Sequence, residues 1–257
     1  MSTDPYDRLD APALRALLAQ RDAQLAEQAA GMEEWMHAVS HDLRAPLRHI
    51  TSYGPLVREL LQESGLPADA QQEALAFLDT MDQSARRMGR MLEGLLALSR
   101  IARAPLRRDA VDLAALVEQA RAPLAEAAQG RSVQWQIAPD LPTVQGDATL
   151  LRQMLTELLA NALKFTRGRE PACIAVGWER GADGQFALTV QDNGAGFNPA
   201  QAAGLFGTFQ RLHRESEFEG VGAGLAAVRA IVRRHGGEAR AAAVPGEGCT
   251  VRVCWAG

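Results

Sequence analysis

The chain has 257 residues, of which 47% are hydrophobic and 23% are charged, and its formal net charge is −4. This length allows one large or two ordinary domains, and the composition is typical of soluble globular proteins. The acidic balance argues against a general nucleic-acid-binding protein, and the lack of an 18-residue apolar run argues against a membrane span. The N-terminus has no signal-peptide pattern and the three cysteines have no metal-ligand spacing, so a cytoplasmic protein is expected.

The segment from Ala11 to Leu61 has the composition of one long helix. Its apolar residues recur seven apart, with others between them at spacings of three and four, which is the pattern of a coiled-coil seam. The residues of this seam are Leu18, Leu25, Ala29, Met32, Met36, Val39 and Leu43. His41 lies beside the seam and should therefore be reachable from outside a helical bundle.

A second long helix is expected from about Ala70 to Arg100, with Asp69 as its cap, after Gly65-Leu66-Pro67 ends the first. Two long helices joined by a short turn form an antiparallel α-helical hairpin. A lone hairpin cannot cover its own apolar stripe, so two chains are expected to pair into a dimeric four-helix bundle.

The composition changes near Ala104-Pro105, and the rest of the chain mixes helices with strands. This mixture predicts an α+β two-layer sandwich, with helices on one face of a mixed sheet. The predicted helices span Leu113–Ala128, Ala148–Phe165 and Gly224–His235. The predicted strands span Ser132–Ile137, Ala172–Glu179, Gln185–Gln191, Glu238–Ala243 and Thr250–Trp255.

The residues Ser40-His41-Asp42-Leu43-Arg44 place an imidazole beside a carboxylate on the first helix. Histidine can be a nucleophile near neutral pH, and a neighbouring carboxylate can hold its ring and accept its proton. The same two residue types often lie together on a helix surface without any function, so the pair alone leaves both interpretations open.

Three polar residues share one side of the helix predicted at Ala148–Phe165. Glu157 and Asn161 are four residues apart, and Lys164 follows three residues later. Magnesium needs only one or two protein oxygens when phosphates supply the others, so Asn161 is a candidate metal ligand and Lys164 a candidate phosphate partner. A solvated face of an amphipathic helix is the alternative interpretation.

Two glycine-rich segments complete a candidate nucleotide site. In Asp192-x-Gly194-x-Gly196, a buried carboxylate at a strand end can accept a hydrogen bond from adenine, and the glycines allow close backbone approach. In Gly220-x-Gly222-x-Gly224-Leu225, the glycines precede a helix and expose backbone N–H groups to phosphate. Each segment alone also fits an ordinary turn or a hinge.

Between the two glycine segments lie some 25 residues, Phe197 to Val221, which are rich in charge and include Arg211. A loop this long inside a compact domain is usually functional, and this one could close over a bound nucleotide. The histidines apart from His41 are expected to have polar surface roles; they are His37, His49, His213 and His235.

The order His41-Asp42, Asn161, Asp192-x-Gly-x-Gly and Gly220-x-Gly-x-Gly resembles the motifs of bacterial sensor histidine kinases, over about Met32 to Trp255. The residues around His41, together with Phe209-Gln-Arg-Leu-His213, are most similar to kinases of the phytochrome-associated type. The resemblance implies a two-component system, in which ATP phosphorylates His41 and the phosphoryl group passes to an aspartate of a response-regulator receiver domain. The second domain resembles the ATPase fold of gyrase and mismatch-repair proteins.

The resemblance also implies a role for each motif residue. His41 would accept the phosphoryl group, and Asp42 would orient its ring or act as a base. The ATP and Mg²⁺ site would use Asn161 for magnesium, Lys164 for phosphate, Asp192 for adenine, Glu157 for a polarised water or magnesium ligand, and Arg211 for the terminal phosphate. The backbone of the same site would come from Gly194, Gly196, Gly220, Gly222, Gly224 and Leu225.

Three domains are implied: a signalling helix at 1–31, a dimerisation and histidine phosphotransfer domain at 32–103, and a catalytic ATP-binding domain at 104–257. No sensor domain precedes the bundle in the sequence. The expectation is therefore either a separate sensor protein that docks on the first helix or a sensor elsewhere in a larger system. Related kinases that dephosphorylate their regulators usually carry a hydroxyl or amide four residues after the acceptor, so Ala45 predicts weak or absent phosphatase activity.

Two other functions remain open beside the kinase. One is a dimeric scaffold that binds nucleotide without kinase turnover, and the intact Asn161, Asp192 and glycines speak against it. The other is an ATPase of the gyrase or mismatch-repair type, and the acidic balance and the His41 hairpin speak against it. The expected partners are a second copy of the chain and a receiver domain, with no nucleic acid and no membrane span.

Overall fold

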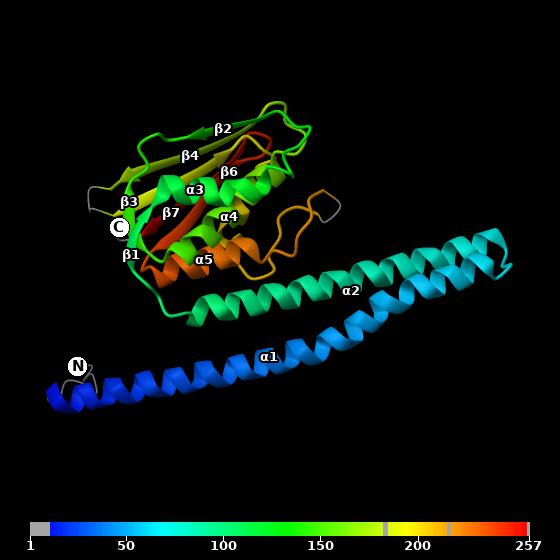
Figure 1. Ribbon diagram of the computed structural model, residues 1–257, viewed down its shortest axis with the longest axis horizontal. Helices are drawn as coiled ribbons and strands as arrows, with labels where there is room; N and C mark the ends of the chain where they lie inside the picture. Colours follow the sequence, from blue (N-terminus) through cyan, green and yellow to red (C-terminus); the bar gives the residue numbers. More distant parts are fainter. Residues whose placement is uncertain (1–10, 182–184, 215–216, 256–257) are drawn as a thin grey trace. The chain divides into compact units, whose positions relative to one another are not determined.

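The computed structural model describes residues 11–181, 185–214 and 217–255. The side chains of residues 13, 14, 16, 22–38 and 203 lie outside the described set. The chain forms two compact units, Met1–Gly89 and Arg90–Gly257. The first unit contains most of a helical hairpin, and the second contains the end of the hairpin's second helix and the sheet (Figure 1).

The hairpin consists of α1 (Ala11–Glu63) and α2 (Ala68–Arg103), which confirms the two predicted long helices. Gly65 in the connecting turn has φ +61, a backbone conformation that glycine adopts without strain. The side-chain amide of Gln71 donates to the carbonyl oxygen of Leu61 at 2.7 Å and so closes the turn. Asp69 was expected to cap α2, but α2 begins one residue earlier and Asp69 lies inside its first turn.

Two prolines lie inside α1, at Pro46 and Pro55, and the helix continues through both. A proline has no N–H to donate and its ring crowds the carbonyl four residues before it, so Pro46 leaves the Asp42 carbonyl without its intrahelical donor. Figure 1 shows that α1 changes direction along its middle part. The helix is therefore bent rather than broken near His41.

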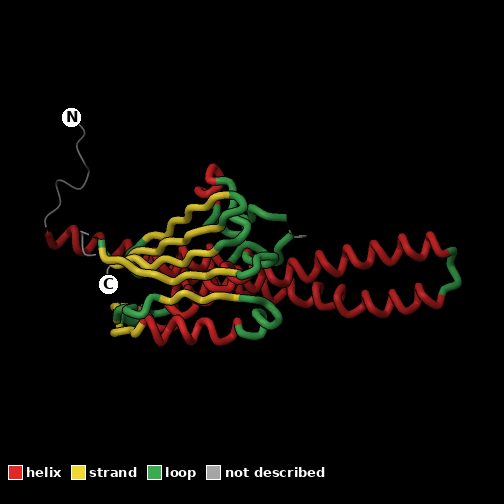
Figure 2. Tube along the Cα trace, turned by 90° about the horizontal axis from the view of Figure 1, so that it is seen from above, coloured by secondary structure: helices red, strands yellow, loops and turns green. Residues whose placement is uncertain are grey.

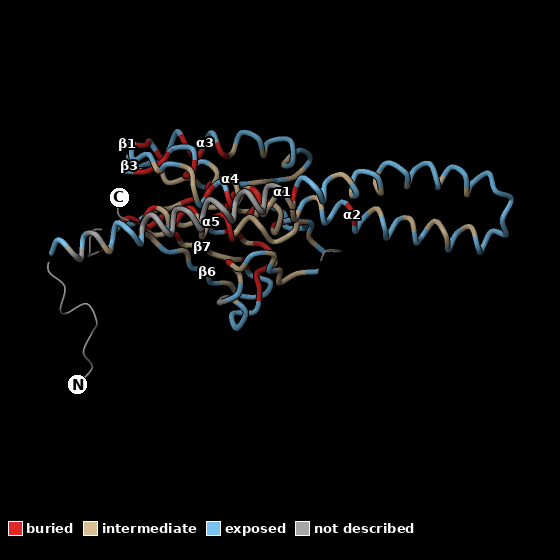
Figure 3. Tube along the Cα trace, turned by 90° about the horizontal axis from the view of Figure 1, so that it is seen from below, coloured by how far each residue is buried: buried red, intermediate tan, exposed pale blue. Residues whose placement is uncertain are grey.

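Much of the apolar surface of the hairpin is exposed in the single chain (Figure 3). The exposed large apolar residues of the first unit are Leu18, Leu43, Tyr53, Leu56, Val57, Leu60, Leu66, Phe77, Met81 and Met88. Two members of the predicted seam, Leu18 and Leu43, belong to this exposed set. The side chains of Leu25, Ala29, Met32 and Met36 lie outside the described residues.

The main sheet has five strands in the order β2-β4-β5-β7-β6, with β2 and β4 parallel and the other pairs antiparallel. Its strands are β2 (Val133–Ile137), β4 (Ala172–Arg180), β5 (Phe186–Asp192), β6 (Glu238–Val244) and β7 (Gly248–Trp255). All five were predicted. A second antiparallel pair was missed; it joins β1 (Asp109–Asp112) to β3 (Thr143–Gly146).

Three helices cover one face of the main sheet, with the core between them, which confirms the α+β sandwich (Figure 2). They are α3 (Leu113–Arg121), α4 (Ala148–Phe165) and α5 (Gly224–Arg234). The helix α4 buries Leu151, Leu155 and Leu159 at intervals of four, as its sequence predicts. On the sheet, alternate residues such as Leu188 and Val190 face the same core.

The helix predicted over Leu113–Ala128 is shorter than expected. After α3, the short 3₁₀ helix η1 (Ala122–Leu124) follows, and turns continue from there. Pro123 explains the difference, because it cannot donate an intrahelical hydrogen bond and its ring clashes with the carbonyl four residues earlier. A second 3₁₀ helix, η2 (Pro199–Gly204), lies in the long segment that precedes α5.

Candidate functional site

The start of α4 is held in place by a buried network around Asp147. The Asp147 carboxylate accepts from the backbone N–H groups of Thr149, Leu150 and Arg107 at 3.0–3.1 Å. Burial opposes ionisation, but these donors outweigh it and lower the pKa of Asp147. The backbone N–H of Asp147 donates to Nε2 of His235 at 3.0 Å. His235 is buried, so the expected surface role is wrong for this residue.

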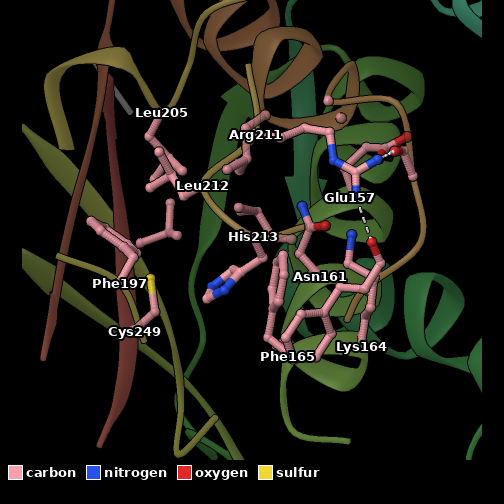
Figure 4. Close-up of a pocket in the computed structure, with 18 of the residues that line it drawn as sticks. Glu157, Asn161, Lys164, Phe165, Phe197, Leu205, Arg211, Leu212, His213 and Cys249 are labelled. Carbon is pink, nitrogen blue, oxygen red and sulfur yellow. Dashed lines mark hydrogen bonds between the residues drawn. The ribbon is translucent and has the colours of Figure 1, made fainter. Parts of the chain in front are cut away.

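The polar face of α4 lines a cavity of about 350 Å³ (Figure 4). Glu157, Asn161 and Lys164 all contribute to its wall, as their spacing predicts. The Nζ of Lys164 lies 4.5 Å from the centre of the Phe165 ring. Phe165 is the last residue of α4 and also lines the cavity.

Burial shifts the pKa values of two of these groups toward their neutral forms. Burial raises the pKa of Glu157, and the charge of Lys164 offsets part of the rise. Burial likewise lowers the pKa of Lys164, while Glu219 and Glu157 raise it and Arg211 and Arg167 lower it further. An added negative charge, such as a phosphate, would therefore stabilise the charged form of Lys164.

Asp192, the last residue of β5, also lines the cavity. It is 8% exposed, and burial raises its pKa to about 6, although N–H groups of Gly194 and Cys249 stabilise its charge. The Gly194 N–H donates to Oδ1 of Asp192 at 2.8 Å. The paired residue Cys249 on β7 also lines the cavity, and burial raises the pKa of its thiol to about 12.

The first glycine segment packs too closely for larger residues. A Cβ on Gly194 would lie 2.5 Å from the carbonyl oxygen of Phe165, and one on Gly196 would overlap that of Val244. Gly196 also has φ +61. Gly196 lines the cavity, whereas Gly194 supports it through its bond to Asp192.

The second glycine segment lies at the start of α5. Gly220, Gly222, Gly224 and Leu225 all line the cavity. A Cβ on Gly222 would overlap the carbonyl oxygen of Gln210, and one on Gly224 would overlap the Glu157 carboxylate. The first turn of α5 therefore approaches the acidic side chain of α4 directly, at the helix end that attracts negative charge.

We call residues 205–223 the η2–α5 loop; residues 215 and 216 within it lie outside the described set. The guanidinium group of Arg211 lines the cavity and donates to the carbonyl oxygens of Phe218, at 2.6 Å, and Gly220. Arg167 at the end of α4 forms a two-point ion pair with Glu219, at 2.6 and 2.8 Å. The Arg211 bonds hold the loop to itself, and the ion pair attaches it to the turn that follows α4.

His213 also lines the cavity, so the expected surface role is wrong for this histidine as well. Its Nε2 lies 2.9 Å from the carbonyl oxygen of Gly196. Its ring is 5.4 Å from that of Phe165 and 5.1 Å from that of Phe218. Sequence reasoning included His213 in a segment that resembles phytochrome-associated kinases but expected a surface role for it, because a single histidine in a charged loop carries no spacing signal.

His41 and Asp42 lie in the hairpin unit. Their side chains are 77% and 81% exposed, and Nδ1 of His41 lies 3.2 Å from Oδ1 of Asp42. A carboxylate can only accept, so the contact selects the tautomer with the proton on Nδ1 and leaves the lone pair of Nε2 available. The ring is therefore held at one nitrogen and open at the other.

The donor set of the cavity fits a magnesium ion that is held largely by a ligand's phosphates. Within the described residues there is no group of three or more His, Cys, Asp or Glu side chains that could hold a metal alone. The Asn161 amide oxygen is one hard donor in the wall, and phosphates and water would supply the others. In the described part of the chain, no helix has the length and apolarity needed to cross a membrane.

Two family models match the chain in the order expected from the motifs. Residues 32–104 match the His Kinase A (phospho-acceptor) domain, which contains His41. Residues 146–256 match the histidine kinase-, DNA gyrase B- and HSP90-like ATPase, which contains the cavity. The chain therefore belongs to the sensor histidine kinases.

Its relatives support the same family. The chain is 31% identical to the methanogenesis regulatory histidine kinase FilI of Methanothrix harundinacea, over 90% of this chain and 25% of FilI. It is 29% identical to the phytochrome-like protein Cph1 of Synechocystis, over 91% of this chain and 30% of Cph1. The chain thus spans about a quarter to a third of the length of these relatives. Full-length ShkA in complex with AMPPNP is similar in structure, with a TM-score of 0.60 and 25% identity, over 87% of this chain and 45% of ShkA.

Proposed function

We propose that this chain is an ATP-dependent protein histidine kinase of a two-component system. It phosphorylates His41 and passes the phosphoryl group to an aspartate of a response-regulator receiver domain. The observation that carries the proposal is the cavity, in which buried Asp192 and the polar face of α4 lie between two glycine segments. An adenine nucleotide presents the matching groups, an amino group at one end and phosphates at the other.

Each end of the nucleotide has a proposed set of partners. The ionised Asp192 accepts a hydrogen bond from the adenine amino group. At the phosphate end, Lys164 supplies positive charge, and the N–H groups at the start of α5 supply donors. Asn161 holds a magnesium ion through its amide oxygen, and the ion neutralises phosphate charge when it is bound. Because Arg211 already donates to two loop carbonyls, we assign it to holding the loop beside the terminal phosphate.

In the first chemical step, the lone pair on Nε2 of His41 forms a bond to the terminal phosphorus. The bond from that phosphorus to the bridging oxygen breaks, and its electron pair leaves on ADP. The proton on Nδ1 of His41 passes to Asp42, which prevents a positive charge from remaining on the ring. In the second step, a carboxylate oxygen of the receiver domain forms a bond to phosphorus and the bond from phosphorus to Nε2 breaks. Asp42 returns its proton to Nδ1, so that the imidazole leaves in its neutral form.

We propose a homodimer as the active form. The exposed apolar residues of the hairpin, among them Leu60 and Phe77, would be covered by the hairpin of a second copy. The surface around exposed His41 would then receive the receiver domain. The sensory input would come from a separate protein or from another part of a larger system, and ATP as substrate points to the cytoplasm.

Labelling the full chain with ATP that carries a radioactive terminal phosphate, in the presence of Mg²⁺, tests this function. We expect protein label that is stable in alkali, labile in acid and abolished by His41→Gln. The exposed residue His49, on the same helix, provides the matched control, and His49→Gln should retain the label. Release of free phosphate without protein label would instead favour a gyrase-type ATPase, and nucleotide binding without either reaction would favour a scaffold.

A further inference from the structure

His213 joins two segments of the nucleotide cavity that are 17 residues apart in the sequence. Its Nε2 lies 2.9 Å from the carbonyl oxygen of Gly196. A carbonyl oxygen can only accept a hydrogen bond, so Nε2 carries the proton and donates it. The η2–α5 loop is thereby bonded to the segment that follows Asp192.

The Gly196 end of this bond is fixed by its own backbone contacts. Ala195 donates its N–H to the carbonyl oxygen of Phe165 at 3.0 Å and accepts from the N–H of Gly246 at 2.7 Å. The left-handed backbone of Gly196 leaves no room for a side chain beside Val244. The direction of the Gly196 carbonyl is therefore determined by neighbours on both α4 and the β6–β7 turn.

The ring of His213 is held from the other side by two phenylalanines. Phe165 and Phe218 lie 5.0 Å apart in an edge-to-face arrangement, and each also contacts the His213 ring. Aromatic pairs at these distances and angles contribute beyond the area they bury. Phe218 belongs to the η2–α5 loop, so the ring packs within the loop as well as against the end of α4.

We propose that His213 is a positioning residue for nucleotide binding, which sets the distance between the adenine end and the phosphate end of the cavity. The adenine end is Asp192, four residues before the Gly196 carbonyl. The phosphate end includes Gly220, which Arg211 holds through its carbonyl. The bond from His213 to Gly196 fixes these ends relative to each other. This inference rests on the proposed ATP-binding function and adds a named residue to it.

The test compares His213→Phe and His213→Gln in the full chain, with ADP and adenosine as the two probes. His213→Phe keeps an aromatic ring beside Phe165 and Phe218 but loses the donor, while His213→Gln keeps a donor in place of Nε2. Loss of one hydrogen bond is expected to weaken ADP binding about fivefold in His213→Phe. Adenosine lacks phosphates, so its affinity should change less than about twofold. His213→Gln should recover part of the ADP affinity, and His49→Phe on the hairpin is the control.

Calorimetric titration measures both affinities, and thermal unfolding shows that the variants fold. An unchanged ADP affinity in folded His213→Phe would overturn the positioning role and leave the kinase proposal intact. An equal loss for ADP and adenosine would also overturn it, because the role would then be general support of the cavity. Failure of the unaltered chain to bind ADP would overturn both proposals together.

Discussion

Replacing Asp192 by asparagine is expected to stabilise the second unit of the chain at neutral pH while abolishing nucleotide binding. The carboxyl group is 8% exposed, and burial raises its pKa from 3.8 to about 6. An amide of nearly the same shape can still accept from the N–H of Gly194 but has no charge to desolvate. It cannot replace the ionised carboxylate as the partner of adenine, because its oxygen is a weaker acceptor and its NH₂ group faces the adenine amino group.

The sign and size of the effect follow from the pKa of Asp192. A carboxyl pKa that is higher in the folded state means that the folded protein binds the proton more tightly, so its stability falls as the pH rises from 3.8 to 6. At about 1.4 kcal/mol per pH unit, the loss reaches about 3 kcal/mol above pH 7 and about half of that at pH 5. The asparagine NH₂ group has imperfect hydrogen-bond partners, so the expected increase in the free energy of unfolding is reduced to about 2 kcal/mol at pH 7.5.

Urea unfolding of the full chain without nucleotide measures this difference at pH 5 and pH 7.5. Tryptophan fluorescence reports on the second unit through Trp255, which is buried in its core. Asp109→Asn is the matched control, because Asp109 is exposed and should give little change at either pH. A lower stability of Asp192→Asn at pH 7.5, or a difference that is the same at both pH values, would refute the reasoning.

Three further predictions concern the backbone, an ion pair and the phosphatase reaction. Gly196→Ala should lower the free energy of unfolding by about 2 kcal/mol or more, because the φ of Gly196 is +61 and a Cβ there would overlap a carbonyl oxygen. In the same urea experiment, Gly204→Ala is the control and should lower it far less, because the space around Gly204 is open. Arg167→Ala should cost under about 1 kcal/mol, because both partners of the ion pair with Glu219 are more than half exposed, and a loss above about 2 kcal/mol in thermal unfolding would contradict this. Ala45→Thr places a hydroxyl one helical turn after His41, the proposed acceptor. It should accelerate the ADP-dependent loss of phosphate from a receiver domain that the chain has phosphorylated. If the unaltered chain already removes this phosphate rapidly, Ala45 does not suppress the reaction.

The parts of the site that could be predicted from sequence are those with a repeating pattern of residue types along a short stretch of chain. The bounds of α4 were predicted as observed, because an apolar repeat of four runs between a capping aspartate and a change of pattern. The same helical spacing predicted that Glu157, Asn161 and Lys164 share a face, and all three line the cavity. The glycine segments were recognisable because close backbone contact excludes a Cβ at several of their positions.

The parts that were missed depend on contacts between distant residues. Strands β1 and β3 have four residues each and pair across 30 or more positions, so neither produces a repeating pattern of its own. His235 looks like a polar residue at a helix end, yet it is buried because the Asp147 N–H needs an acceptor there. His213 is similar, since its role depends on the carbonyl direction of Gly196. No local sequence pattern indicates that His213 and His235 make such contacts.

The interruption at Pro46 affects how α1 responds to force. The helix lacks the hydrogen bond that the Asp42 carbonyl would otherwise accept, so its bending stiffness is reduced within one turn of His41. A twist applied to the residues before His41 would accordingly relax as a change of bend angle at this point, and less of it would be carried on toward Gly65. The histidine that we propose as phosphoryl acceptor therefore lies beside a compliant joint of the helix that presents it.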